Sequence, residues 1–191
     1  MKQLTNSRDS QAQLEQMVED LLTEAKKQGA SAAEAGISSD TGLSIHVRMG
    51  EVETSEHTRD QGLGVTVFMG QRKGTASTTD FSPQAVRDTV RAACNIASHT
   101  TEDPYSGLAD AELMARDLPD LDLYHPWDID VDAAIELGAA CEDAALKLDA
   151  RISNSEGASV SSHNGLQVYG NSHGFIGGYP SSRHSLSCAV V

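Results

Sequence analysis

Histidine and carboxylate side chains are the groups in this chain that could bind a metal ion or transfer a proton. A helical zinc site needs them at a fixed spacing, as in His-Glu-x-x-His or the longer His-Glu-x-x-x-His, so that they face one ion. None of the seven histidines among the 191 residues is followed by glutamate. We therefore expect no metal ligand and no catalytic residue in this chain.

Two smaller groups of ionisable residues allow a second interpretation. His99, Glu102 and Asp103 lie close enough in sequence to touch a cation. A histidine that interacts with the dipole of a helix C-terminus is the simpler explanation of His99. Glu51 and Glu53 would share one face of a strand and could hold a cation or form an acid pair. A solvated sheet face explains them more simply.

Nucleophile and phosphate motifs are absent from the sequence. There is no Gly-x-Ser-x-Gly elbow and no P-loop, which gives no support to serine hydrolysis or to nucleotide binding. The segment Gly62-Leu63-Gly64 lacks the third glycine and the following helix of a dinucleotide loop. We expect a bulge or a turn in a strand there.

Composition indicates an ordinary globular protein, with 39% hydrophobic, 22% charged and 4% aromatic residues. The net charge of -14 argues against nucleic-acid binding, because surfaces that bind DNA or RNA are basic. Between Glu102 and Asp149, 14 acidic residues are accompanied by only Arg116 and Lys147. A solvated surface is the simpler explanation of this acidity, and a docking face for a basic partner is the alternative.

The sequence also indicates a cellular location. Residues 1–11 form no signal peptide and no run of 18 apolar residues occurs, so we expect a cytoplasmic protein without a membrane contact. Cys94, Cys141 and Cys188 are odd in number and widely spaced, which is typical of small buried thiols in a reduced compartment.

Hydrophobic periodicity predicts an α+β fold, mainly an antiparallel sheet with about three helices packed on it. Helices are expected at residues 10–28, at 81–99 after the N-cap Ser82, and at 131–148 after the N-cap Asp130. Alternating residues predict strands at 34–39, 43–48, 51–58, 63–68, 74–78, 158–162, 166–169, 174–179 and 185–191. Turns are expected at 40–42, 50, 60–62 and 70.

Residues 100–127 contain three prolines and predict an extended connector, with one short helical turn near 110–116. The connector would divide a domain of residues 1–191 into halves of about 10–110 and 128–191. Residues 37–45 and 160–168 share an apolar residue, Ser-Ser, two turn residues and Gly-Leu. This similarity predicts two duplicated helix-plus-hairpin halves, with Gly42 and Gly165 at equivalent turns. Chance similarity of two hairpins is the alternative.

The chain ends in the apolar run Leu186–Val191, which has the pattern of a strand. We expect a fragment of a longer protein in which this strand has lost a neighbour. A bare apolar edge tends to pair with another chain, so we expect self-association of the fragment. Alternatively, Leu186–Val191 lies in the middle of the sheet and is paired on both sides.

Several segments together resemble the N-terminal region of the PmbA/TldD family. The first group is Arg48-Met49-Gly50-Glu51-Val52-Glu53, Gly62-Leu63-Gly64-Val65-Thr66-Val67, Lys73-Gly74-Thr75-Ala76-Ser77-Thr78-Thr79-Asp80 and Ser82-Pro83-Gln84-Ala85. Later segments are similar to the PmbA (TldE) branch: Pro119-Asp120-Leu121-Asp122-Leu123-Tyr124-His125-Pro126, Asn171-Ser172-His173-Gly174 and Ser182-Arg183-His184-Ser185-Leu186. The resemblance covers the chain from about residue 12 onward.

This resemblance implies a cytoplasmic bacterial metalloprotease system. In it, TldD-type and TldE-type subunits pair to degrade unfolded peptides, with roles in microcin maturation and antitoxin turnover. The family's His-Glu-x-x-x-His belongs to the TldD branch and lies beyond this region, so zinc is expected only in a TldD-type partner. Family members are more than twice as long as this chain, and their C-terminal domain is absent here.

The hypothesis that follows is a non-catalytic N-terminal domain that helps to form a substrate chamber. Four residues would contact peptide: Asn171, His173, Arg183 and His184. Arg183 and His184 could grip a peptide carboxylate or backbone, but protection of a sheet edge by charge explains them equally well. A solvated turn is the simpler explanation of His173. An older family label, modulator of DNA gyrase, gives an alternative function as a protein-interaction domain acting on gyrase.

Overall fold

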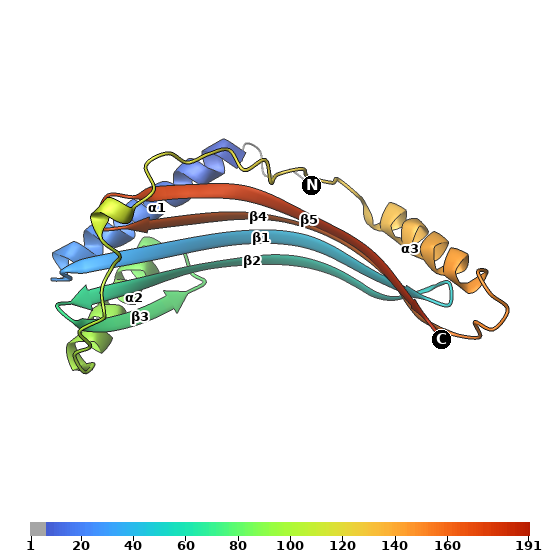
Figure 1. Ribbon diagram of the computed structural model, residues 1–191, viewed down its shortest axis with the longest axis horizontal. Helices are drawn as coiled ribbons and strands as arrows, with labels where there is room; N and C mark the ends of the chain where they lie inside the picture. The colour runs from blue at the N-terminus through green and yellow to red at the C-terminus, as the bar shows by residue number, and fades with distance from the viewer. Residues whose placement is uncertain (1–6) are drawn as a thin grey trace. The chain divides into compact units, whose positions relative to one another are not determined.

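The computed structural model describes residues 7–191, which form three α-helices, one short 3-10 helix and a five-stranded antiparallel sheet (Figure 1). The predicted α+β class is therefore confirmed. The helices are α1 (Ser7–Lys27), α2 (Pro83–His99), η1 (Ala111–Leu113) and α3 (Val131–Leu146). The strands are β1 (Ala32–Arg48), β2 (Glu51–Met69), β3 (Arg72–Thr78), β4 (Ser155–Asn171) and β5 (Ile176–Val190).

Local capping explains where the helices begin and end. The Ser82 hydroxyl accepts a hydrogen bond from the Ala85 N–H at the start of α2, and Asp130 does the same for Ala133 N–H at the start of α3. After α1, Gly29 has a φ of 92°, and the N–H of Ala30 donates to the carbonyl of Ala25 at 3.1 Å. These contacts are typical of a helix ended by a left-handed glycine. All three predicted helices are confirmed.

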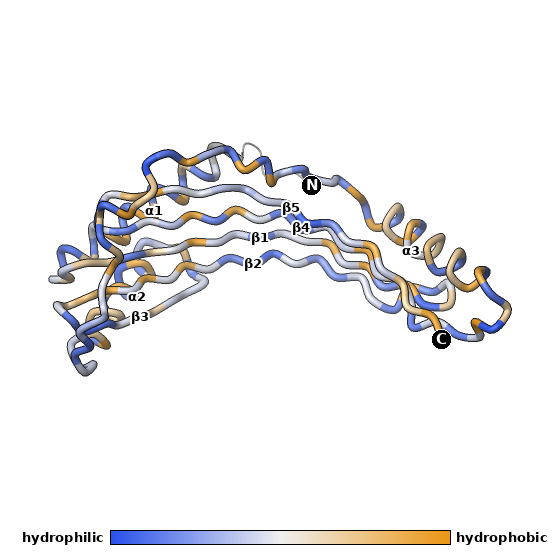
Figure 2. The backbone as a smooth tube through the Cα atoms, viewed as in Figure 1, coloured by the Kyte–Doolittle hydropathy of each residue, from blue (hydrophilic) through white to orange (hydrophobic). Residues whose placement is uncertain are grey.

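The strand order is β3-β2-β1-β4-β5. β2 and β3 pair in antiparallel register from Leu63 with Thr78 to Met69 with Arg72. Tight turns separate β1 from β2 and β2 from β3, and they contain Gly50 and Gly70 with φ of 79° and 62°. The alternation of hydrophobic and hydrophilic residues along the strands is visible in Figure 2.

The turns expected at residues 40–42 and 60–62 are wrong, because β1 and β2 continue through both segments. β4 likewise continues through residues 163–165 and β5 through residues 180–184. Polar and glycine residues that are typical of turns also suit a sheet face that no helix covers. The predicted strands are therefore real, but pairs of them are single long strands.

The two similar segments lie side by side on the neighbouring strands β1 and β4. A Cβ added to Gly42 would meet the ring of His163, and a Cβ added to Gly165 would meet the carboxylate of Asp40. Each glycine thus makes room for a side chain of the other copy. Gly42 and Gly165 occupy the same position within their 17-residue strands, and neither lies in a turn. The predicted equivalent turns are wrong, whereas the duplication itself stays a prediction.

Two compact units are distinguished by the packing. Among the described residues, unit 1 comprises residues 7–39, 61–121 and 166–180, and unit 2 comprises residues 40–60, 122–165 and 181–191. Each unit has its own hydrophobic core. In unit 1, α1 and α2 cover one face of the sheet and bury alternate residues of the strands, such as Ala35, Val65 and Val168. The division of the chain into halves around a connector at 100–127 stays a prediction.

Unit 2 has a smaller core beneath α3. Ala134 of α3 packs against Ile45 and Val47 of β1 and Val160 of β4, and all four side chains are buried. The stretch of β2 between residues 51 and 60 is exposed along its whole length and carries many charged residues. Charges along such a stretch hinder pairing with another chain.

β5 is the last strand in the order, so the alternative in which Leu186–Val191 is paired on both sides by strands is wrong. Part of its outer edge contacts the connector, where the N–H of Ser182 donates to the carbonyl of Leu123 at 2.9 Å. Leu186 is 46% exposed and Val190 is 37% exposed. Self-association through this edge stays a prediction.

Two further expectations concern thiols and membranes. Cys94, Cys141 and Cys188 are all free, and burial raises the pKa of Cys94. Only Cys94 is buried, since the other two thiol residues are half-buried. No helix within residues 7–191 combines the length and the apolar character that a membrane span requires.

Candidate functional site

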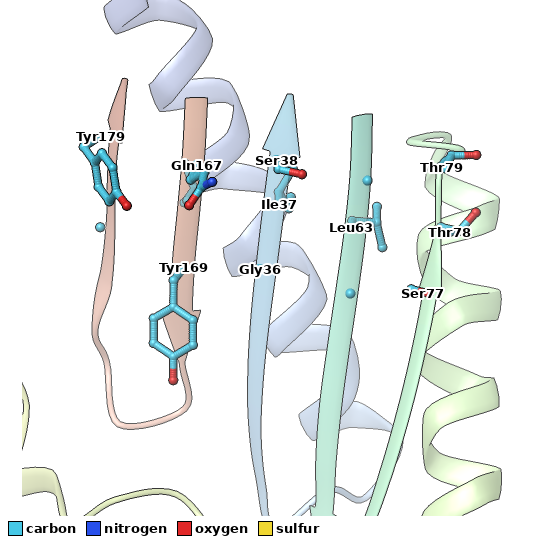
Figure 3. Close-up of a pocket in the computed structure, with 14 residues that line it drawn as sticks. Gly36, Ile37, Ser38, Leu63, Ser77, Thr78, Thr79, Gln167, Tyr169 and Tyr179 are labelled. Atoms are coloured by element: carbon cyan, nitrogen blue, oxygen red, sulfur yellow. The ribbon is translucent and has the colours of Figure 1, made fainter. Parts of the chain in front are cut away.

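A groove of about 880 Å³ lies in unit 1 on the sheet face opposite α1 and α2 (Figure 3). Five strands contribute to it, although they are far apart in the sequence. The lining residues are Gly36, Ile37, Ser38, Gly62, Leu63, Gly64, Ser77, Thr78, Thr79, Gln167, Val168, Tyr169, Gly177 and Tyr179. The space is open to solvent over much of its extent, so it is a broad surface groove and not an enclosed cavity.

The two ends of the groove differ in chemistry. Tyr169 and Tyr179, on β4 and β5, form an aromatic end, whereas Ser77, Thr78 and Thr79 bring hydroxyl groups from β3 and the residue after it (Figure 3). No lining residue is an aspartate, glutamate, lysine, arginine or histidine. The groove therefore offers aromatic surface and neutral hydrogen-bonding groups, which suit binding rather than acid–base chemistry.

Tyr169 is held in place by two polar neighbours outside the groove. Its hydroxyl donates to Oε2 of Glu34 at 2.9 Å, and Nδ2 of Asn171 donates to the same hydroxyl at 3.4 Å. Burial, which is the largest cause, raises the pKa of Tyr169. The tyrosine thus stays neutral and keeps the hydrogen bond to Glu34 at physiological pH.

The four residues predicted to contact peptide are distributed over both units. Asn171 and His173 belong to unit 1, while Arg183 and His184 belong to unit 2. Asn171 is only 1% exposed, and its Oδ1 accepts a hydrogen bond from the His173 N–H at 3.0 Å within the turn after β4. Asn171 therefore supports Tyr169 and the turn. His173 and Arg183 are exposed, and peptide contact by the four residues stays a prediction.

His184 of β5 anchors the end of the connector in unit 2. Its Nε2 lies 2.8 Å from the carbonyl oxygen of His125, and its Nδ1 lies 3.1 Å from the hydroxyl of Ser162. The imidazole also makes an edge-on contact with the Trp127 ring at 5.6 Å between centroids. These contacts give His184 a structural role that the sequence pattern did not indicate.

The smaller ionisable groups are engaged in other contacts. Nδ1 of His99 lies 2.9 Å from the carbonyl of Asn95, as expected for a histidine at the end of a helix. Glu102 pairs with Arg72 at 3.3 Å, and Glu53 lies 3.6 Å from Arg48. Within residues 7–191, no cluster of three or more histidine, cysteine or acidic residues has a geometry that could hold a metal ion.

Glu142 is a buried carboxylate that sequence reasoning missed. It is 2% exposed, and its two oxygens accept hydrogen bonds from the N–H groups of Met49 at 2.9 Å and Gly50 at 3.0 Å. α3 thereby holds the turn between β1 and β2. The signal was present in the sequence, because Ala134, Gly138 and Glu142 recur every four residues on the buried face of the helix.

Glu142 should make the stability of the fold depend on acid pH. The Ser155 hydroxyl first, and then the Met49 and Gly50 amides, hold the pKa of Glu142 below its ordinary value of 4.5, although burial opposes this. A lowered pKa in the folded state means that the carboxylate stabilises the fold above the unfolded pKa. That stabilisation is lost as the pH falls through the folded pKa.

We therefore expect the Glu142→Gln variant to lose less stability than the wild type as the pH falls below about 4.5. Urea unfolding of both proteins at several pH values would measure this. Identical pH dependence in the two proteins would contradict the assignment.

Comparison with known proteins identifies the family. Residues 33–97 match the model of PmbA/TldA metallopeptidase domain 1, and residues 124–191 match that of the PmbA/TldA metallopeptidase central domain. The chain is 54% identical over 159 residues to metalloprotease PmbA of Escherichia coli O157:H7, covering 83% of this chain and 35% of that protein. It is 52% identical over 179 residues to the PmbA homologue of Haemophilus influenzae, covering 94% and 40%.

Solved structures show the same fold. A protein of Bacteroides thetaiotaomicron described as a modulator of DNA gyrase superposes with a TM-score of 0.84 at 23% identity, covering 93% of this chain and 41% of that one. TldE from Thermococcus kodakarensis superposes with a TM-score of 0.78 at 15% identity, covering 91% and 39%. This chain spans only 35% to 40% of the length of the two curated relatives. The two consecutive domain matches and the close curated relatives show that the chain belongs to the PmbA/TldD metallopeptidase family.

Proposed function

We propose that this chain is the N-terminal part of a TldE-type subunit, which acts with a TldD-type subunit to degrade unfolded peptides in the cytoplasm. The observation that carries the proposal is the pair of consecutive family-domain matches, together with 52% to 54% identity to proteins named metalloprotease PmbA. Microcin maturation and antitoxin turnover are the physiological roles that the family resemblance implies.

In this proposal the chain binds substrate and does not cleave it. The sequence contains no histidine followed by glutamate, so zinc and the catalytic glutamate would come from the TldD-type subunit. The groove in unit 1 supports a binding role, because its lining offers aromatic and hydroxyl groups without an acid or a base. The groove would form part of the wall of the substrate chamber.

The outer edge of β5 is a second surface that could take part in this role. Residues 185–190 carry no charged side chain, in contrast to the charged stretch 51–60 of β2. An extended peptide could add to this edge through main-chain hydrogen bonds, which tolerate many sequences. Pairing with a second copy of the chain would use the same edge.

Mixing experiments test the division of labour between the subunits. We expect the purified 191-residue chain to contain no stoichiometric zinc and to leave reduced, unfolded casein intact. The full-length parent protein, mixed with a TldD-type subunit, should degrade the casein, and a chelator should stop the reaction. Stoichiometric zinc and chelator-sensitive cleavage by the chain alone would contradict the proposal, as would full activity of the TldD-type subunit without its partner.

A further inference from the structure

The floor of the unit 1 groove is formed by glycines that the fold itself does not require. Gly36 lies in β1, and Gly62 and Gly64 lie in β2, all with φ outside the left-handed region. A Cβ added to Gly62 would meet no atom within 4 Å. A Cβ on Gly36 or Gly64 would approach its nearest neighbour only to 3.9 Å, which is ordinary contact. Alanine would therefore fit at all three positions.

Glycine weakens a strand relative to alanine, because it loses more backbone freedom on folding and contributes no side-chain packing. Two other glycines of unit 1 have a structural reason. A Cβ on Gly74 would collide with the backbone of α2, and one on Gly177 would lie 2.6 Å from the Leu118 side chain. The three floor glycines have no such neighbour, so their effect is to keep the sheet surface open at the level of the backbone.

The lining of the groove indicates what could lie on this floor. Tyr169 and Tyr179 supply ring faces and edges, and Gln167, Thr78 and Thr79 supply neutral donors and acceptors. Figure 3 shows the tyrosines and the threonines at opposite ends of the row of strands, with Gly36 of β1 between them. An extended segment lying across the strands would thus meet aromatic groups at one end and hydroxyl groups at the other.

The charge of the lining residues indicates the charge of the segment that the groove could bind. The chain carries a net charge of -14, yet none of the lining residues carries a formal charge. The neighbouring carboxylate of Glu34 already accepts the hydrogen bond from Tyr169. A charged side chain placed in the groove would lose hydration without gaining an ionic partner, which is unfavourable. The electrostatic match is therefore to a neutral segment.

We propose that the groove binds an uncharged segment of an unfolded peptide and places an apolar side chain on the floor formed by Gly36, Gly62 and Gly64. The identification of the occupant as a peptide rests on the proposed function. The tyrosines pack against the apolar side chain, while Gln167 and the hydroxyl groups bind peptide N–H and C=O groups. The groove thus selects neutral, apolar segments from among unfolded chains.

Binding of three capped hexapeptides to the 191-residue chain tests this selection by calorimetry. The probes are acetyl-Gly-Ser-Phe-Leu-Ser-Gly-amide and two versions in which Phe-Leu is replaced by Lys-Lys or Glu-Glu. We expect the Phe-Leu peptide to bind at least tenfold more tightly than either charged version. Equal binding of the three peptides, or no binding of the Phe-Leu peptide, overturns the proposal.

Variants of the floor connect this binding to the groove. Gly36→Val and Gly64→Val should each raise the Kd of the Phe-Leu peptide at least tenfold, because the added side chain occupies the floor. Gly64→Ala should raise the Kd by a smaller factor. This variant tests the same position if a valine variant does not fold. Thr66→Val, which changes the same strand outside the groove lining, is the matched control and should leave the Kd unchanged. The melting temperatures of the folded variants should not fall below that of the wild type.

The same variants separate this inference from the proposed function. Introduced into the full-length parent protein, Gly64→Val should reduce casein degradation in the mixture with a TldD-type subunit. If Gly64→Val changes neither the degradation of casein nor the affinity for the peptide, the proposed binding of peptide in the groove is wrong. The proposed two-subunit function is then unaffected. Loss of peptide affinity in the valine variants, with no partner-dependent degradation by the wild type, supports the groove as a binding site and refutes the function.

Discussion

Replacing Glu142 with alanine is expected to lower the free energy of unfolding by about 3 kcal/mol. The carboxylate is 2% exposed and accepts hydrogen bonds from the N–H groups of Met49 and Gly50. Both residues have positive φ, 50° and 79°, in the turn between β1 and β2. Alanine would leave both N–H groups without this acceptor and would remove the link between α3 and the turn. Denaturant unfolding followed by circular dichroism would measure the loss.

Glu136→Ala is the matched control, because Glu136 is on the same helix with an exposed side chain. An exposed substitution of this kind should change stability by no more than about 0.5 kcal/mol. If Glu142→Ala and Glu136→Ala were equally mild, the turn would not depend on the buried carboxylate. In that case α3 would be held by apolar packing alone.

Gly74→Ala is expected to destabilise the protein by about 3 kcal/mol through overpacking. Gly74 lies in β3 directly beneath α2, and an added Cβ would collide with the carbonyl oxygen of Ala93 and the amide nitrogen of Ala97. Both are backbone atoms, so no side-chain rotation could relieve the contact. The whole helix would have to move away from β3, which would loosen the core of unit 1.

Thermal unfolding of Gly74→Ala beside Gly64→Ala would test this interpretation. Gly64 lies in the neighbouring strand β2, and an added Cβ would find its nearest atom at 3.9 Å. We therefore expect Gly64→Ala to melt at or slightly above the wild-type temperature. A Gly74→Ala protein as stable as the wild type would show that α2 can shift over β3 without loss of packing.

The helices could be predicted because their determinants are close in sequence. Ser82 and Asp130 each accept a hydrogen bond from the N–H three residues later, and Gly29 ends α1 with its own backbone conformation. Such signals lie within a few positions of the helix end, and tertiary packing does not change them. Gly50 and Gly70 were predicted as turns for the same reason.

Strand length was predicted poorly because it depends on partners far away in sequence. Asp40, Thr41 and Gly42 have the composition of a turn, but Gly42 stays extended beneath the ring of His163 on the neighbouring strand. Burial of Asn171 likewise depends on residues that the sequence pattern does not place beside it. Asn171 is 1% exposed and its Nδ2 donates to the hydroxyl of Tyr169, while its predicted contact with peptide stays a prediction.

By itself, the sequence determined the α+β class, the helix ends, the absence of a histidine–glutamate zinc motif and the resemblance to the PmbA/TldD family. These properties follow from residue types and from spacings of a few positions. Only the tertiary structure decided that Gly36, Gly64 and Tyr169 share one groove and that Glu142 meets the turn at Gly50. The reason is physical, because strand register and helix packing bring together residues about a hundred positions apart in the sequence. Local propensity carries no information about contacts between such distant residues.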